Sequence, residues 1–185
     1  MKDNGTPGSG KATRSCRCGY GKASGRACGR GPNCEAVYQS RVSGPLFDRM
    51  DISIDLAPVA PSDLARPANG EASADVARRI GRAREIQTGR ASALGLPAAL
   101  NAALPDAGLD RVAEPDAEGL ALLKRAAETL GFSARAYHRI LRLARTLADL
   151  EAVDAVKRRH IAEAVSYRRR DGGEERPPLA AAVGA

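Results

Sequence analysis

The fold of this chain is decided by the stretch Arg41-Val-Ser-Gly-Pro-Leu-Phe-Asp-Arg49-Met-Asp-Ile-Ser-Ile-Asp-Leu56. In its second half apolar and polar residues alternate, which is the pattern of a half-buried strand. In its first half Pro45 suits the first turn of a short helix, because proline lacks an N–H group and has a fixed φ. The sequence therefore predicts a short helix followed by a strand near residues 51–56, with Arg49 at the junction.

The side chain of Arg49 has two interpretations. A guanidinium is charged at all relevant pH values and can pair with two phosphate oxygens at once, so Arg49 is a candidate phosphate ligand. The alternative is a local surface ion pair with Asp48. The surrounding motifs described below favour the first interpretation.

The composition restricts the possible partners and the compartment. The chain has 185 residues, a formal net charge of +7 and an isoelectric point near 9.6, which favours partners such as nucleotides or nucleic acid. No apolar run is long enough to span a membrane, and the first residues lack the apolar region of a signal peptide. We therefore expect a cytoplasmic protein without a membrane partner, whose cysteines are thiols or metal ligands.

The first residues contain a motif that resembles part of a phosphate-binding loop. Residues 1–14 are polar and glycine-rich, which is typical of a flexible segment. Within them, Gly5-Thr-Pro-Gly-Ser-Gly10-Lys11 fits the front of a P-loop. A P-loop needs a preceding hydrophobic strand and a Ser or Thr after the lysine, whereas here Ala12 follows it. We interpret the motif as a chance match.

Four cysteines follow within a short basic stretch, Cys16, Cys18, Cys28 and Cys34. Four thiolates can form a tetrahedral zinc site, and nearby positive charge favours their deprotonation. Their spacing is irregular, because the first pair is closer than the usual CxxC and no second pair matches it. Structural Zn²⁺ and four free thiols remain equal alternatives.

A basic helix is predicted after a proline-rich loop, beginning at Ser73 as the N-cap. One face carries Val76, Ile80, Ala83 and Ile86 at helical spacing. The opposite face carries arginines, of which Arg78, Arg79 and Arg82 are the candidates for contacting a DNA backbone, with Arg84 and Arg90 further along. The alternative is a solvated face, partly neutralised by Glu85. Residues 91–115, rich in Ala, Gly and Pro, are predicted to form a long connection.

Three further helices are predicted at about 116–130, 134–150 and 157–168. Gly131 is a typical helix stop, and Ser133 is a typical N-cap for the next helix. Because the connections are short, these helices should pack as a small bundle. Arg135 lies in the first turn of the middle helix, where free N–H groups and the helix dipole favour an anion.

Several separated motifs resemble one family in the right order. They are the stretch Ser40–Ile52, the helix segment Ala83-Arg-Glu-Ile-Gln87, the helix Ser133–Leu150 and the closing His160-Ile-Ala-Glu-Ala-Val-Ser-Tyr-Arg168. Together they resemble the C-terminal part of magnesium-chelatase-like AAA+ ATPases, most closely the ComM-type (YifB) branch. The resemblance implies a mainly α fold: the C-terminal helical lid bundle of an AAA+ module, with a short remnant of its α/β part.

The resemblance also implies an organisation of the chain into five parts. A flexible N-terminus (1–14) is followed by a cysteine-containing loop, the arginine-finger helix and the last strand of an AAA+ core (15–60). A linker with the basic helix (61–115) leads into the helical lid (116–170). Residues 171–185 are predicted to be a disordered tail.

The functional residues of that family can be carried over to matching positions. The resemblance implies ATP and Mg²⁺ as cofactors, with Arg49 as an arginine finger that acts in trans on a neighbour's ATP. It assigns Arg135 to the sensor 2 position, which binds the subunit's own ATP. It further implies a homo-oligomeric ring or an upstream ATPase core as partner, and ATP-driven DNA branch migration in natural transformation and recombination.

The chain also departs from the family's pattern. It has no credible Walker A or Walker B motif, so we expect no ATPase activity from the chain alone. In the family, the asparagine of the motif Asn-Pro-Cys-x-Cys-Gly helps to orient the water that attacks ATP. The corresponding segment here is Arg14-Ser-Cys-Arg-Cys-Gly, so the absence of the asparagine argues against this role. The alternative function is a non-catalytic, basic DNA- or protein-binding module derived from the family. A third possible function, as a subunit of a chelatase that acts on a porphyrin, is suggested by the family's name only, and no residue of this sequence supports it.

Overall fold

The computed structural model describes residues 33–39, 49–54, 59, 61–64 and 70–168. The fold of these residues is mainly α, as predicted, and consists of α-helices and one short 3₁₀ helix. Their only β pairing is an isolated parallel bridge between Pro115 and Val156. Predictions for residues 1–32 and 169–185 lie outside the described residues, and the division into five parts stays a prediction.

Helix α6 (Ala117–Leu130) begins and ends on local signals. The Asp116 carboxylate accepts a hydrogen bond from the Gly119 N–H at 2.7 Å and caps the helix. Gly131 ends the helix in the left-handed conformation, with φ of 63°. A Cβ atom at Gly119 would lie 2.8 Å from Asp116 Oδ1 and 3.3 Å from a side-chain carbon of Ile161. A glycine at this position therefore allows helix α8 to approach closely.

Helices α7 (Ala134–Leu150) and α8 (Arg158–Ser166) complete the predicted bundle. The Ser133 hydroxyl accepts a hydrogen bond from the Ala136 N–H at 3.2 Å, which confirms Ser133 as the N-cap of α7. Helix α8 packs against both α6 and α7. The core between them is apolar and includes Leu123, Ile140, Leu141, Ala144, Ala148, Ile161 and Ala164.

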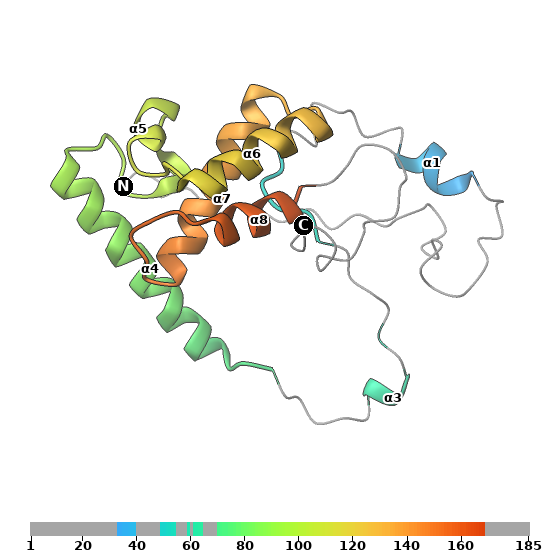
Figure 1. Ribbon diagram of the computed structural model, residues 1–185. Coiled ribbons are helices and arrows are strands. Elements are labelled where there is room, and N and C mark those ends of the chain that lie inside the picture. The colour runs from blue at the N-terminus through green and yellow to red at the C-terminus, as the bar shows by residue number, and fades with distance from the viewer. Residues whose placement is uncertain (1–32, 40–48, 55–58, 60, 65–69, 169–185) are drawn as a thin grey trace, which may run out of the picture.

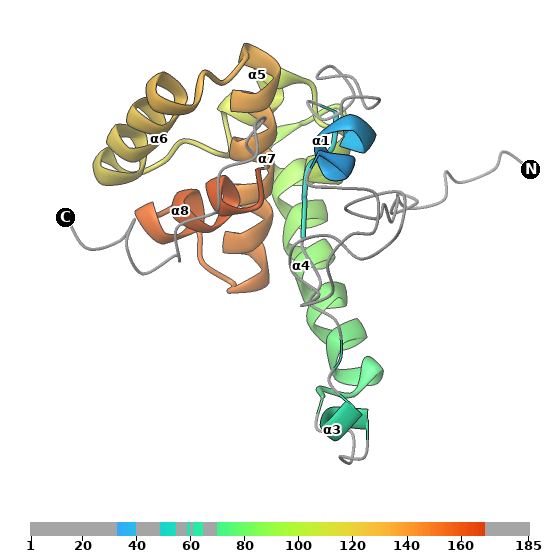
Figure 2. The ribbon, with the colours of Figure 1, turned by 90° about the vertical axis from the view of Figure 1, so that its right-hand side faces the viewer.

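Helix α4 (Ser73–Leu94) packs against α7 with its C-terminal half only. Its buried residues are Ala83, Gln87 and Ala91, and its N-terminal half extends past the bundle in Figures 1 and 2. Ile80, expected on the buried face, is 41% exposed because no other described element covers that half. The prediction of Ser73 as N-cap was wrong by one residue, since Ala72 occupies that position without a side-chain hydrogen bond.

The connection predicted for residues 91–115 is more structured than expected. Helix α4 continues to Leu94, and the 3₁₀ helix η2 (Asn101–Ala103) and helix α5 (Asp106–Asp110) follow. Leucines and other apolar residues of this region enter the core, namely Leu104, Leu109, Val112 and Ala113. The Ala-, Gly- and Pro-rich composition did not predict η2 and α5, because these short helices are stabilised by burial rather than by helix propensity.

The strand predicted near residues 51–56 is absent from its described part. Residues 52–54 have no strand partner in the part of the chain that the structure describes, and Ile52 and Ile54 are 47% and 63% exposed. A strand requires a neighbouring strand for its backbone hydrogen bonds, and here the Ser53 N–H donates to the Tyr167 carbonyl, just after α8, at 2.9 Å. The segment is therefore attached to the bundle without forming a sheet.

Two short helices lie outside the bundle, α1 (Cys34–Gln39) and α3 (Pro61–Leu64). The short helix predicted to begin at Pro45 lies outside the described residues. None of the helices that the structure describes combines the length and the apolar character needed to cross a membrane.

Candidate functional site

Helix α7 carries four arginines, and they differ in what they bind. Arg139 pairs with Asp51 at 2.5 Å, and Arg142 donates to the carbonyls of Asn101 and Leu104 at 3.0 and 2.9 Å. Arg145 is buried in a network described below. Arg135, in the first turn, is exposed and makes no hydrogen bond or ion pair with the described residues.

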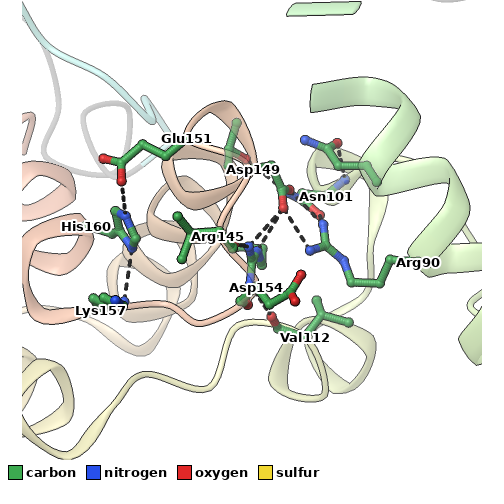
Figure 3. A network of polar contacts seen from close by, with 12 residues as sticks. Arg90, Asn101, Val112, Arg145, Asp149, Glu151, Asp154, Lys157 and His160 are labelled. Atoms are coloured by element: carbon green, nitrogen blue, oxygen red, sulfur yellow. Dashed lines mark hydrogen bonds and ion pairs between the residues drawn. The ribbon is translucent and has the colours of Figure 1, made fainter. Parts of the chain in front are cut away.

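The buried network is centred on the carboxylate of Asp149, whose side chain is fully buried (Figure 3). Arg90 of α4 donates to both carboxylate oxygens, at 2.8 and 2.7 Å. Asn101 donates to the same carboxylate at 2.8 Å, and Arg145 donates to it at 3.1 Å. Segments 59 residues apart in the sequence thus meet at one carboxylate.

The remaining donors of Arg145 point to backbone carbonyls. It donates to Val153 at 2.6 Å, to Asp154, and to Val112 at 3.4 Å. Burial lowers the pKa of Arg145, and the negative charge of Asp149 opposes that effect. Among the described residues, no fully buried side-chain N or O atom lacks a hydrogen-bond partner. With its donors and acceptors satisfied internally, the network fixes α4 and the loop after α7 in place and offers no open site for a ligand.

A second polar cluster joins the end of α7 to the start of α8. His160 is fully buried, and its Nδ1 accepts a hydrogen bond from the Lys157 N–H at 3.0 Å. Its Nε2 is therefore the protonated nitrogen and donates to Glu151 at 3.1 Å (Figure 3). Hydrogen bonds from Arg159 and His160 lower the pKa of the Glu151 carboxyl. Both ring nitrogens of His160 are occupied, so the cluster is structural.

The two arginines predicted to meet ATP are both exposed. Arg49, like Arg135, makes no hydrogen bond or ion pair with the described part of the chain. Arg139 lies one helical turn after Arg135, and its partner Asp51 lies two residues after Arg49. The structure therefore attaches the segment of Arg49 to the helix of Arg135, which the sequence did not predict.

The three candidate DNA-contacting arginines of α4 differ from one another. Arg78 pairs with Asp75 at 2.6 Å, and Arg79 pairs with Glu71 at 3.0 Å. Arg82 is exposed and has no acidic partner among the described residues. Arg90 had been placed on the same basic face, and that was wrong, because it faces the bundle and binds Asp149.

Of the residues in the predicted metal and phosphate motifs, Cys34 is the one that the structure describes. Cys16, Cys18, Cys28 and the segment Gly5–Lys11 lie outside the described residues. Cys34 is a half-buried free thiol in α1. The part of the chain that the structure describes has no cluster of three or more His, Cys, Asp or Glu side chains placed to bind a metal.

Sequence reasoning missed the buried network. A signal was present, because Arg145 and Asp149 are spaced as i and i+4 and directly follow the buried Ala144 and Ala148. Charged residues adjacent to the most buried positions of an amphipathic helix indicate burial with a partner. The partner Arg90, on another helix, carried no such signal.

Comparison with known families and proteins supports the resemblance described above. The family "Magnesium chelatase, subunit ChlI C-terminal" matches residues 70–168, and "Magnesium chelatase, subunit ChlI" matches residues 9–64. The first match includes α4, the buried network and the whole bundle. The second includes the cysteines and Arg49.

Two curated relatives have the same degree of similarity. The competence protein ComM of Haemophilus influenzae and the protein YifB of Escherichia coli are each 37% identical to this chain over 132 residues. The aligned region is 71% of this chain and 25% of each relative. The chain thus spans about a quarter of the length of these relatives.

Proposed function

The chain belongs to the magnesium chelatase, subunit ChlI C-terminal family, and from this membership we propose that it is the C-terminal part of an AAA+ ATPase that remodels DNA. The remodelling reaction is branch migration during natural transformation and recombination. The complete assembly has an ATPase core in addition to this chain and a ring-like arrangement of subunits. The activity of the complete assembly is proposed here, because this chain spans about a quarter of the length of its relatives.

The observation that carries this proposal is the exposure of Arg135. The other three arginines of α7 are bonded to carboxylates or carbonyls. Arg135 alone on that helix has an exposed guanidinium without a partner among the described residues, in the first turn of a helix of 17 residues. Free N–H groups and the helix dipole favour an anion at this position. A nucleotide phosphate fits this combination of donors.

Arg49 and Arg135 would have complementary roles in ATP hydrolysis. Bound ATP with Mg²⁺ supplies the phosphoryl group whose transfer to water releases free energy. Arg49, one residue before the segment attached to the bundle, extends toward the nucleotide of a neighbouring subunit and stabilises the negative charge that develops on the transferred group. Arg135 binds phosphate oxygens of the nucleotide held by its own subunit.

Substitution of Arg135 tests the proposal in a reconstituted assembly, in which this chain is joined to the ATPase core of a relative. Arg135→Ala should weaken ATP binding and also lower the turnover number, since it removes a contact made before and during the reaction. Isothermal titration and steady-state ATPase measurements give both quantities. Arg125→Ala is the matched control, because Arg125 is exposed on α6. Unchanged binding and turnover in Arg135→Ala would contradict the proposal.

A second function, a DNA-binding surface on α4, is favoured by the exposure of its N-terminal half. Arg82 and Arg84 are exposed there without acidic partners among the described residues, whereas Arg78 and Arg79 are locally neutralised. Each phosphate contact contributes about 0.9 to the slope of log K against log salt concentration. Arg82→Ala should therefore reduce that slope by about 0.9 and Arg78→Ala by less. Equal slopes for the parent and Arg82→Ala would remove Arg82 from the DNA surface.

A further inference from the structure

We propose that Arg139 and Arg168 are positioning residues for Arg49, and that the helical bundle thereby sets the place of the arginine finger. The inference rests on the proposed function for the role of Arg49 itself. Its structural basis is the attachment of residues 50–53, here called the tethered segment, to α7 and to the end of α8. Figure 1 shows this segment, in cyan, beside the end of α8.

The first attachment is a salt bridge between α7 and the tethered segment. Arg139 Nη1 lies 2.5 Å from Asp51 Oδ1, and the two residues are 88 positions apart in the sequence. The Arg139 side chain is 23% exposed, while that of Asp51 is 54% exposed. The bundle therefore holds the arginine in place, and the aspartate is the partner that depends on the contact for its position.

The other two attachments come from the residues that follow α8. Arg168 donates to the Met50 carbonyl at 2.6 Å, and the Ser53 N–H donates to the Tyr167 carbonyl at 2.9 Å. Together with the salt bridge, they hold the tethered segment at three successive places. Met50 is adjacent to Arg49, and consecutive Cα atoms are about 3.8 Å apart. The contact of Arg168 thus fixes the backbone immediately next to the finger.

Apolar burial explains little of the position of the tethered segment. The isoleucines in and next to it, Ile52 and Ile54, are 47% and 63% exposed, while Met50 is half-buried. Three polar contacts join it to the bundle. A single exposed ion pair contributes little to the free energy of folding. The contacts therefore act mainly by placing Arg49 rather than by stabilising the bundle.

Helix α7 is thus connected to both arginines that are proposed to contact ATP. It contains Arg135, and through Arg139 it binds Asp51, two residues after Arg49. Arg135 and Arg139 are spaced as i and i+4, so they lie on one side of α7. A movement of α7 that accompanies phosphate binding at Arg135 would be transmitted through Arg139 and Asp51 to Arg49. This connection makes the position of the finger depend on the position of the bundle.

Charge reversal tests the attachment in the full 185-residue chain, without any ATPase core. We expect Arg139→Asp and Asp51→Arg, each alone, to accelerate hydrogen exchange of the Ser53 amide about three- to fivefold, the effect of losing one partly exposed ion pair. The double variant restores the ion pair with reversed polarity and should return exchange to the parental rate. Arg125→Asp on α6 is the control for a change of charge elsewhere on the bundle.

A second readout connects the attachment to catalysis in the assembly with an ATPase core. Arg139→Asp and Arg168→Met should lower kcat at least about tenfold without changing KM, because a misplaced finger affects the transition state and not nucleotide binding. The double variant Arg139→Asp/Asp51→Arg should recover kcat. A purely structural role would not give rescue by reversed charges.

The two proposals fail in different ways. If Arg49→Ala leaves kcat unchanged, the proposed function of Arg49 is wrong, whatever the exchange rates show. If Arg49→Ala lowers kcat but the variants of Arg139 and Arg168 do not, the positioning role is wrong and the finger remains. A Ser53 exchange rate within about twofold of the parent in both single charge reversals would also overturn the attachment.

Discussion

The arginines of α7 and those of the N-terminal half of α4 are equally frequent in the sequence, but they differ in their partners. On α7, acceptors from distant segments bind Arg139 and Arg142. Arg145 is buried and binds Asp149 of its own helix, carbonyls of the following loop and the distant Val112 carbonyl. On α4, Arg78 and Arg79 pair only with acidic residues three and eight positions away. An arginine thus becomes structural where the fold brings acceptors to it, and remains a surface charge where only its sequence neighbours are available.

The energetic consequences of the two situations differ by an order of magnitude. Removing one partner from a buried ion pair leaves an uncompensated charge and costs about 3–5 kcal/mol. An exposed pair such as Arg78–Asp75 contributes about 0.2–1 kcal/mol or less. The buried network therefore affects the stability of the bundle, while exposed arginines remain available for ligands.

The largest effect is expected at Asp149. Asp149→Ala removes the acceptor shared by Arg90, Arg145 and Asn101, and should lower the free energy of unfolding by about 3–5 kcal/mol. Asp75→Ala, which breaks the exposed pair with Arg78, should change it by less than about 0.5 kcal/mol. Urea denaturation followed by circular dichroism measures both. Similar losses in the two variants would remove the distinction between the two regions.

A smaller effect is expected at Arg90. Arg90→Met should lower the free energy of unfolding by about 1–3 kcal/mol, because two charged hydrogen bonds to Asp149 are lost. The loss is smaller than in Asp149→Ala, since Asp149 keeps Arg145 and Asn101 as partners. Arg82→Met is the matched control on the same helix, since Arg82 is exposed. Urea midpoints compare the two variants. Equal midpoints would show that α4 is not held by the network.

The smallest effect concerns Glu151 and depends on pH. Its pKa is lowered from 4.5 by hydrogen bonds from Arg159 and His160, so its contribution to stability is complete above the unfolded value and is lost as pH falls through the folded value. Because the side chain is 41% exposed, the contribution should be at most about 1 kcal/mol at pH 7. Glu151→Gln should thus be less stable than the parent at pH 7, and this difference should shrink as pH falls below 4.5.

Urea denaturation at several pH values measures this difference. Glu128→Gln, a substitution at an exposed position of α6, serves as control. A difference between parent and Glu151→Gln that does not change from pH 7 to pH 3 would contradict the electrostatic origin of the contribution.

The bounds of the bundle helices were predictable because their signals are local. Ser133 caps α7, and Gly131 ends α6 with a positive φ, as their residue types indicated. The strand near residues 51–56 was wrongly predicted in its described part, because alternation shows a strand's preference but not whether a partner strand is present. The positions of α5 and η2 depended on burial, which the sequence did not show.

The candidate site was predictable only in part. The exposure of Arg49 and Arg135 agrees with the roles that the family resemblance assigned to them, although those roles stay predictions. The attachment of Asp51 to Arg139 joins residues 88 positions apart, and the bond of Arg90 to Asp149 joins residues 59 apart. Neither pair has a local sequence pattern, because the fold alone brings its members together.

The most direct test of the central claim is ATP turnover in an assembly that contains increasing fractions of Arg49→Ala chain, joined to the ATPase core of a relative. An arginine finger supplied in trans raises kcat by a factor of about 10³–10⁵. Turnover should therefore fall in proportion to the fraction of Arg49→Ala chain, and the pure variant should be slower by about 10³ or more while binding ATP as tightly as the parent. A pure Arg49→Ala assembly that hydrolyses ATP at the parental rate would show that Arg49 is an ordinary surface charge.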